Sequence, residues 1–184
     1  MAKIEKEPNT ALYPVPVVLV TCVDDAGGAN IITIAWAGIV CSEPPMVSIA
    51  IRPHRYSHPL IAASGEFVVN IPGEDLLRET DGCGMVSGRD ADKFEKFGLT
   101  AEPGSKTKVP LIKECPVSME CKVTKRLSLG THDLFIGEVL AVHIDESVLD
   151  EKERVDFAKA KPITFNNGEY WNLKEKIGHY GFTK

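Results

Sequence analysis

Residues 15–36 read VPVVLVTCVDDAGGANIITIAW, and this stretch contains the clearest indication of the fold. Its first nine residues are almost continuously apolar and rich in β-branched side chains, which is typical of a strand covered on both faces. The next six residues, DDAGGA, favour a turn, and residues 30–36 then resume strand character. The stretch therefore predicts a β-hairpin in the interior of a β-rich protein.

Four further segments alternate between apolar and polar residues with a period of two, as half-buried strands do. They are residues 46–52, 66–71, 117–123 and 134–144. In the third segment the alternation places Glu120 on the polar face. In the fourth it predicts a buried apolar face that also carries Glu138. The apolar members of that face are Leu134, Ile136, Leu140, Val142 and Ile144.

The helical patterns are short and lie at residues 57–64, 90–97 and 150–161. Asp90 is the expected cap of the second helix, and Gly98 is the expected stop. Many short strands with a few small helices predict a mainly β fold, arranged as a closed or partly closed barrel. No repeat or linker divides the chain, so residues 1–184 form one predicted domain.

Composition excludes several classes of protein. The chain has 21 Lys and Arg against 26 Asp and Glu, and this net charge of −5 lacks the basic footprint of a nucleic-acid binder. No run approaches the roughly 18 apolar residues of a membrane span, and the first residues lack the apolar core of a secretory signal. We therefore expect a cytoplasmic protein without membrane or nucleic-acid partners. The five cysteines contain no CxxC pair and predict neither a disulfide framework nor a metal site.

The densest polar cluster is RPHRYSH at residues 52–58, where a strand gives way to a short helix. A helix N-terminus attracts anions, the hydroxyl of Ser57 can donate, and Arg52 and Arg55 can add charge-assisted hydrogen bonds. The cluster therefore indicates a phosphate site. A solvated basic loop after an edge strand is the alternative.

Three other segments contain residue types that can bind a ligand. GIVCSEPP at 38–45 can aim backbone N–H groups at a planar ligand, or it is a plain tight connection. SGRDADKF at 87–94 opens a helix with two cations, or it is an ordinary capped helix start. HDLFIGEV at 132–139 places His132 at the head of a strand, where it reaches a barrel mouth or is simply exposed. Glu138 there is more readily explained by a structural hydrogen bond than by catalysis.

Taken in order, these segments resemble the flavin reductase-like, FMN-binding split-barrel family, and most closely its flavoredoxin-like members. The motifs are NIITIAW (30–36), CSEPP (41–45), IRP (51–53), YSH (56–58), FVVNIP (67–72), SGRD (87–90), KF (93–94), HD (132–133) and IGEV (136–139). Each motif alone is weak, but their order over about residues 10–170 is specific.

The resemblance implies a Greek-key split β-barrel that forms a homodimer and holds FMN near the subunit interface. It implies that Ser57 and Arg55 bind the FMN phosphate, and that Lys93 and His132 reach the flavin or its phosphate side. The remaining residues implied to hold the cofactor are Asn30, Thr33 and Trp36 from the second strand, the backbone of Cys41 and Ser42 facing the ring, and Phe165 packing on the ring from the same or the partner chain.

The resemblance further implies an oxidoreductase in which NAD(P)H reduces bound FMN, and FMN reduces free flavin or another acceptor. The alternative is a flavoredoxin-type electron carrier between protein partners, without NAD(P)H activity of its own. Hydride transfer to a flavin requires no dedicated acid or base, so no catalytic side chain is expected. A third hypothesis, a thiol protein using Cys83 in its glycine-flanked turn, has no nearby histidine to support it.

Overall fold

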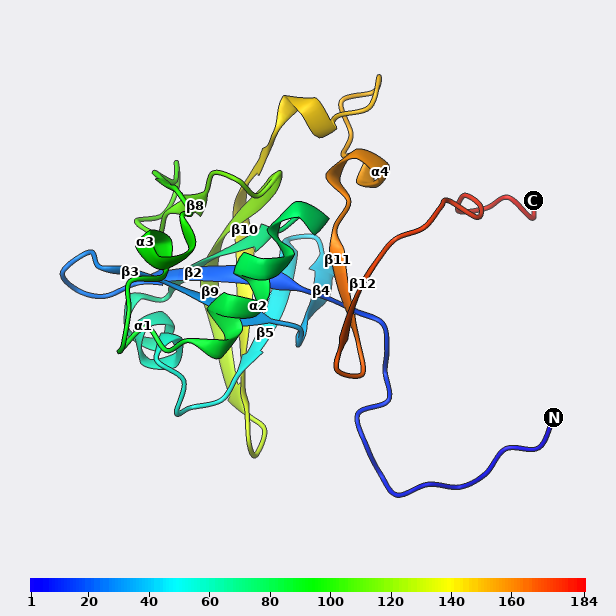
Figure 1. The fold of residues 1–184 in the computed structure, drawn as a ribbon, viewed down its shortest axis with the longest axis horizontal. Coiled ribbons are helices and arrows are strands. Elements are labelled where there is room, and N and C mark those ends of the chain that lie inside the picture. Colours follow the sequence, from blue (N-terminus) through cyan, green and yellow to red (C-terminus); the bar gives the residue numbers. More distant parts are fainter.

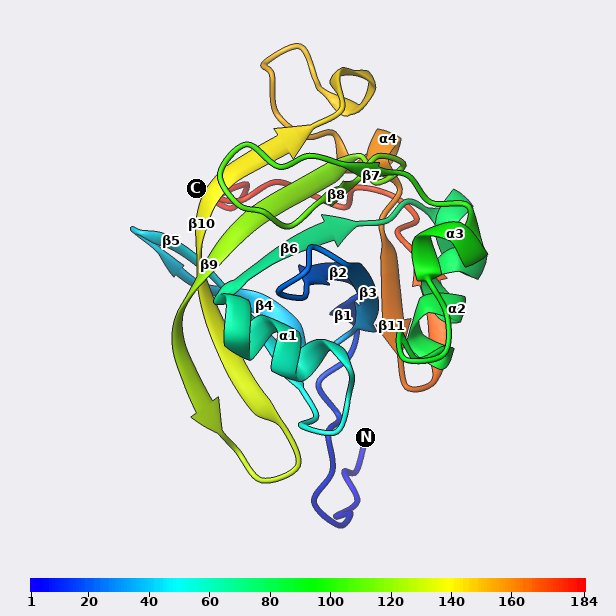
Figure 2. The ribbon, with the colours of Figure 1, turned by 90° about the vertical axis from the view of Figure 1, so that its left-hand side faces the viewer.

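The computed structural model describes residues 1–184, and its centre is a single seven-stranded antiparallel sheet (Figure 1). The strand order is β3-β2-β6-β9-β10-β5-β4. The bounds are β2 (Val18–Val23), β3 (Ala29–Ile34), β4 (Ala37–Ser42), β5 (Pro45–Ile51), β6 (Glu66–Ile71), β9 (Val117–Ser128) and β10 (Asp133–Ile144). Figure 2 shows this sheet curling around a common interior. Its edge strands β3 and β4 do not pair with each other, so the predicted barrel is split rather than closed.

Short elements cover the ends and one side of the barrel. The helices are α1 (Ser57–Ser64), α2 (Leu77–Met85), α3 (Lys93–Phe97) and α4 (Phe157–Ala160), with short 3₁₀ turns at Glu74–Leu76 and Glu146–Val148. The remaining strands are β1 (Val15–Pro16), β11 (Ile163–Asn166) and β12 (Glu169–Asn172), which form one sheet, and β7 (Ala101–Glu102) and β8 (Leu111–Ile112), which form another. Both chain ends extend away from the barrel (Figure 1). None of the helices combines the length and apolarity that a membrane span requires.

The predicted hairpin is confirmed as β2 and β3, which pair from Val18 opposite Ile34 to Val23 opposite Ala29. Every residue of β2 is buried. Alternate residues of β2 face opposite sides: Val20 belongs to the cluster inside the barrel, and Leu19 belongs to a second cluster beneath α2 and α3. Two covered faces explain why this strand is apolar throughout.

The prediction that the even-numbered residues of 134–144 form the buried face of the strand is wrong. In β10 the inward positions are Asp133, Phe135 and Gly137, and two register shifts interrupt its pairing with β9. Gly137 is required there, because a Cβ atom would lie 2.6 Å from the ring of Phe67. Glu138 faces outward and is only partly buried. The predicted apolar residues are outward and partly exposed, with Leu140 at 37% and Val142 at 51%.

Two of the predicted helices differ from the observed ones. The second begins at Lys93 rather than 90, because Asp92, not Asp90, accepts hydrogen bonds from the backbone of the first turn. The third is reduced to α4 at its C-terminal end. Before α4, the carboxylate of Asp150 accepts the N–H groups of Lys152 and Arg154 and pairs with the Arg154 guanidinium. Those bonds close a tight turn in place of a helix.

Helix α2 was not predicted, because residues 77–85 contain two glycines and no apolar period. Gly82 has a packing role there: a side chain at this position would collide with the ring of Phe97. The glycine that weakens the helix signal in the sequence thus allows α2 and α3 to approach each other.

Glu120 lies on the face opposite the inward-facing Cys121, as the alternation predicts, but it is fully buried there. Its carboxylate accepts hydrogen bonds from the backbone N–H groups of residues 105–107 and from His143 Nε2 at 2.7 Å. Burial alone would raise the pKa of Glu120, but these hydrogen bonds lower it overall. An ionised carboxylate therefore fixes the 103–109 loop against the outside of the sheet.

Candidate functional site

Two cavities adjoin beside β3, where the end of β5 and the residue before β10 approach it. The larger, which we call the aromatic pocket, has a volume of about 400 Å³, and the smaller, the polar pocket, about 170 Å³. Ile32, Arg55 and Gly84 line both of them. The two pockets are therefore neighbours with a shared wall, and together they form one site with two chemically different ends.

The polar pocket is built around a buried hydrogen bond between β3 and α1. Asn30 Nδ2 donates to Ser57 Oγ at 2.7 Å, and both side chains are buried. Ser57 is the first residue of α1, so the helix dipole adds positive potential at its hydroxyl. This arrangement fixes one hydroxyl at the floor of the pocket and favours an anion next to it.

Lys93 supplies a buried cation to the same pocket. Its Nζ donates to the carbonyl of Ile31 at 2.6 Å and to that of Cys83 at 2.7 Å. Burial lowers the pKa of Lys93, although two carbonyl acceptors offset part of the cost of desolvating an ammonium group. An ammonium group has three donors, so one remains for a ligand.

Two arginines and a glycine complete the polar pocket. Arg55 and Arg89 line it, and the Arg89 guanidinium lies 5.4 Å over the ring of Tyr56. A Cβ atom at Gly88 would collide with the side chain of Asn30 and lie 2.6 Å from Tyr56. A glycine is therefore necessary for the chain to pass this close. A hydroxyl, an ammonium and two guanidinium groups are the donors that suit a phosphate monoester.

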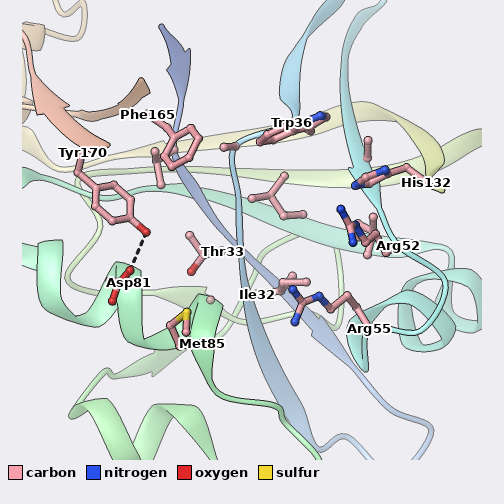
Figure 3. A pocket seen from close by; sticks show the side chains of 16 residues that line it. Ile32, Thr33, Trp36, Arg52, Arg55, Asp81, Met85, His132, Phe165 and Tyr170 are labelled. Atoms are coloured by element: carbon pink, nitrogen blue, oxygen red, sulfur yellow. Dashed lines mark hydrogen bonds between the residues drawn. The ribbon is translucent and has the colours of Figure 1, made fainter. Parts of the chain in front are cut away.

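The aromatic pocket has planar side chains on one side and cations at one end (Figure 3). Ile32 and Thr33 of β3 form its floor, and the rings of Trp36 and Phe165 lie above them with centroids 6.3 Å apart. The Thr33 hydroxyl already donates to the carbonyl of Thr80. Thr33 can therefore pack against a ligand but has no free hydrogen-bond donor for it. Such walls suit a flat aromatic ligand.

His132 and Arg52 lie together at the cationic end of the aromatic pocket (Figure 3). The imidazole of His132 is parallel to the Trp36 ring, with centroids 6.4 Å apart. Burial lowers the pKa of His132, and the neighbouring Arg52 and His54 act in the same direction. His132 is therefore uncharged at neutral pH and can both donate and accept a hydrogen bond.

Sequence reasoning missed the opposite end of the aromatic pocket. There Tyr170 Oη from β12 donates to Asp81 Oδ1 from α2 at 3.0 Å (Figure 3). Burial, followed by the charge of Asp81, raises the pKa of Tyr170 to about 12. Residues 81 and 170 are far apart in sequence, and neither the α2 segment nor the aromatic pair at 170–171 carries a signal that joins them.

The structure brings together eight of the ten residues expected at the cofactor. In the polar pocket are Asn30, Arg55, Ser57 and Lys93, and in the aromatic pocket are Thr33, Trp36, His132 and Phe165, with Arg55 shared. Cys41 and Ser42 line neither pocket. Residues 38–45 are not a loop, because residues 37–42 form strand β4, which pairs with β5 through a turn at 43–44.

The structure also removes the basis of the thiol hypothesis. Cys83 lies within α2 rather than in an exposed turn, and its side chain is fully buried. Burial raises the pKa of Cys83 to about 11, so the reactive thiolate is scarce at neutral pH.

The comparisons with known proteins agree with this geometry. Residues 10–174 match the model of the flavin reductase like domain. Flavoredoxin of Desulfovibrio vulgaris (Miyazaki F) superposes with a TM-score of 0.94 at 33% identity, covering 100% of both chains. Flavoredoxin from Methanosarcina acetivorans superposes with a TM-score of 0.91 at 31% identity, covering 100% of this chain and 97% of that one.

An enzyme is also among the relatives. The NADH:riboflavin 5'-phosphate oxidoreductase of Streptomyces pristinaespiralis is 33% identical over 122 residues, which is 66% of each chain. The match to the family model covers nearly all of the folded part of the chain, including both pockets. This protein belongs to the flavin reductase-like family of split-barrel flavoproteins.

Proposed function

We propose that this protein binds FMN, with the phosphate in the polar pocket and the isoalloxazine ring in the aromatic pocket. The observation that carries the proposal is that the two pockets adjoin and share Ile32, Arg55 and Gly84 in their walls. FMN joins a dianionic phosphate to a flat ring system, and the site joins a cluster of cationic donors to an aromatic wall.

Each side chain then has a defined role. Ser57, Lys93 and Arg55 hold the phosphate, together with Arg89, which the sequence reasoning did not assign. Asn30 fixes the Ser57 hydroxyl through their 2.7 Å hydrogen bond. The rings of Trp36 and Phe165, with the surface of Thr33, pack against the flavin, and His132 lies beside it.

We also propose a homodimer that works in the cytoplasm. Cys41 and Ser42 lie outside the pockets of their own chain. In the proposed dimer they approach the flavin of the other copy, which accounts for their place in the family motif. Strand β4 is an edge of the sheet, and its Ile39 is an exposed apolar side chain, as an interface strand requires.

The reaction we propose is the NAD(P)H-dependent reduction of a flavin or a related acceptor. Bound flavin supplies the redox chemistry, and the protein binds and orients it. The chain contains no dinucleotide-binding fingerprint, so a nicotinamide has to stack directly on the open side of the aromatic pocket. The relative named as an NADH:riboflavin 5'-phosphate oxidoreductase supports this function.

An electron carrier between protein partners is the second candidate. The two flavoredoxins, at 33% and 31% identity, support it. A carrier uses the same FMN site but does not have to admit a nicotinamide.

A visible absorption spectrum tests both candidates. Purified protein that has been mixed with FMN and freed of excess cofactor should retain the bands of oxidised flavin near about 370 and 450 nm. Bleaching of those bands by NADH or NADPH selects the reductase, and bands that persist select the carrier. A protein that retains no FMN contradicts the proposed function.

A further inference from the structure

A buried ionic network joins helix α1 to the start of β10 and lines neither pocket. His58 Nε2 lies 2.8 Å from Asp133 Oδ2, and the two residues are only 6% and 3% exposed. The same carboxylate oxygen accepts Arg126 Nε at 2.9 Å and lies 2.7 Å from Arg126 Nη2. The His58 ring also meets the face of Phe135 edge-on, with centroids 5.3 Å apart.

The two ends of this network are adjacent in sequence to the two pockets. His58 follows Ser57, the hydroxyl of the polar pocket, on the first turn of α1. Asp133 follows His132, the imidazole of the aromatic pocket, at the start of β10. The 2.8 Å contact therefore joins the helix whose first residue lines the polar pocket to the strand that begins directly after His132 of the aromatic pocket. Figure 2 shows α1 beside the long β9–β10 hairpin.

The network stabilises the ionised form of Asp133. Hydrogen bonds from His58, and then from Ser128 and Arg126, lower the pKa of Asp133 to about 2. The titratable and charged groups that face this carboxylate are Arg126 from β9 and His58 from α1, and Phe135 of β10 packs against the His58 ring. A buried carboxylate held by two partners resists rearrangement, because the loss of either partner removes a hydrogen bond that stabilises its charge.

We propose that His58 and Asp133, braced by Arg126, are positioning residues that hold the polar and aromatic pockets at the separation that FMN requires, and thereby make the site select FMN over riboflavin. This inference rests on the proposed function. A ligand that fills both pockets gains from its second contact only when the pockets are spaced to match it. Riboflavin lacks the phosphate and fills the aromatic pocket alone, so its affinity does not depend on that spacing.

The test is the ratio of the dissociation constants for riboflavin and FMN, measured by flavin fluorescence. His58→Ala should weaken FMN binding by about tenfold, the lower end of the effect seen when supporting residues around a site are removed. Riboflavin binding should change by less than about twofold. His58→Gln should restore most of the ratio, because its amide can still donate towards Asp133.

The chain provides a matched control in His143 and Glu120. This pair also joins a histidine to a buried carboxylate, at 2.7 Å, but it links β10 to β9, fixes the 103–109 loop and lines neither pocket. His143→Ala should lower the melting temperature without changing the ratio. If His58→Ala proves unable to fold, Arg126→Ala replaces it, because the Arg126 side chain is 47% exposed and tolerates removal. In Arg126→Ala the ratio of the dissociation constants for riboflavin and FMN should fall by about threefold.

The possible outcomes separate the two proposals. A wild-type protein that binds neither flavin contradicts the proposed function itself. A wild-type protein that prefers FMN, with variants that weaken both flavins equally or leave the ratio unchanged, overturns the positioning role alone. The positioning role is also overturned if His143→Ala lowers the ratio of dissociation constants as much as His58→Ala does. The effect would then follow from lowered stability and not from the position of the pockets.

Discussion

The two ends of the candidate site are built in different ways. In the polar pocket the side chains of Asn30, Ser57 and Lys93 are buried and already hydrogen-bonded to each other or to the backbone. In the aromatic pocket the walls are rings held by packing, and Trp36 is 42% exposed. The comparison indicates that the two ends of the site have different functions. A preformed end recognises the head group, and an open end leaves one side of the ring accessible to a reaction partner.

The largest expected effect comes from a substitution that fills the polar pocket and leaves the aromatic pocket unchanged. Gly88→Ala places a methyl group against the side chain of Asn30 and the ring of Tyr56. We expect FMN affinity to fall by about a hundredfold, which corresponds to about 2.7 kcal/mol. Riboflavin affinity should be retained, because the aromatic pocket is untouched. Isothermal titration with both flavins measures the difference.

Gly178→Ala is the control for that substitution. A Cβ atom at Gly178 would make only ordinary contacts, the nearest at 3.5 Å from the Phe182 ring, and the residue is exposed and lines neither pocket. An equal loss of both flavins in Gly88→Ala would show that the two ends are not independent.

The next test removes the buried cation. Lys93→Met takes away the donor to a phosphate and also the hydrogen bonds to the carbonyls of Ile31 and Cys83. We expect FMN affinity to fall by at least about tenfold and stability to fall by about 2 kcal/mol, because two buried acceptors lose their partner. Binding titrations and urea unfolding measure the two effects. Lys96→Met on the same helix is the control, since its side chain is exposed.

Glu120 provides a third test, in a buried polar cluster outside both pockets. The folded protein holds the pKa of Glu120 below its ordinary value of 4.5, so its contribution to stability is complete above that pH. That contribution is lost as the pH falls from about 4.5 towards the lowered pKa. We expect the urea midpoint to drop more between pH 7 and pH 3 in the wild type than in Glu120→Gln, which is less stable at pH 7.

FMN affinity at pH 7 should be the same in folded Glu120→Gln as in the wild type. A loss of affinity there would mean that the 103–109 loop is coupled to the site after all.

The smallest effect is expected at the open end. Tyr170→Phe removes the hydrogen bond to Asp81 but keeps the ring that lines the aromatic pocket. Because a single partly exposed hydrogen bond contributes about 1 kcal/mol or less, we expect both flavins to weaken by about two- to fourfold. Tyr180→Phe in the exposed C-terminal tail is the matched control. A loss confined to FMN would place Tyr170 with the phosphate and contradict the division proposed here.

The sequence alone determined the features that depend on neighbouring residues. The hairpin within residues 15–36, the strand at 66–71 and the helix at 57–64 agree with the structure, because strand alternation, turn residues and the glycine that ends a helix act over a few positions. The basic cluster at 52–58 was found for the same reason, since Ser57 and Arg55 lie within one strand-to-helix junction. The family motifs added Asn30 and Lys93, and the structure places both in the polar pocket.

Only the tertiary structure decided the features that depend on distant partners. The alternation in 134–144 shows that two faces exist, but the packing of Phe67 against Gly137 decides which face is buried. Glu120 is buried because the 103–109 loop supplies its donors. The Asp81–Tyr170 pair joins residues 89 positions apart. Such contacts depend on how the whole chain closes, since a residue's own neighbours fix its direction along a strand but not what it meets across the barrel.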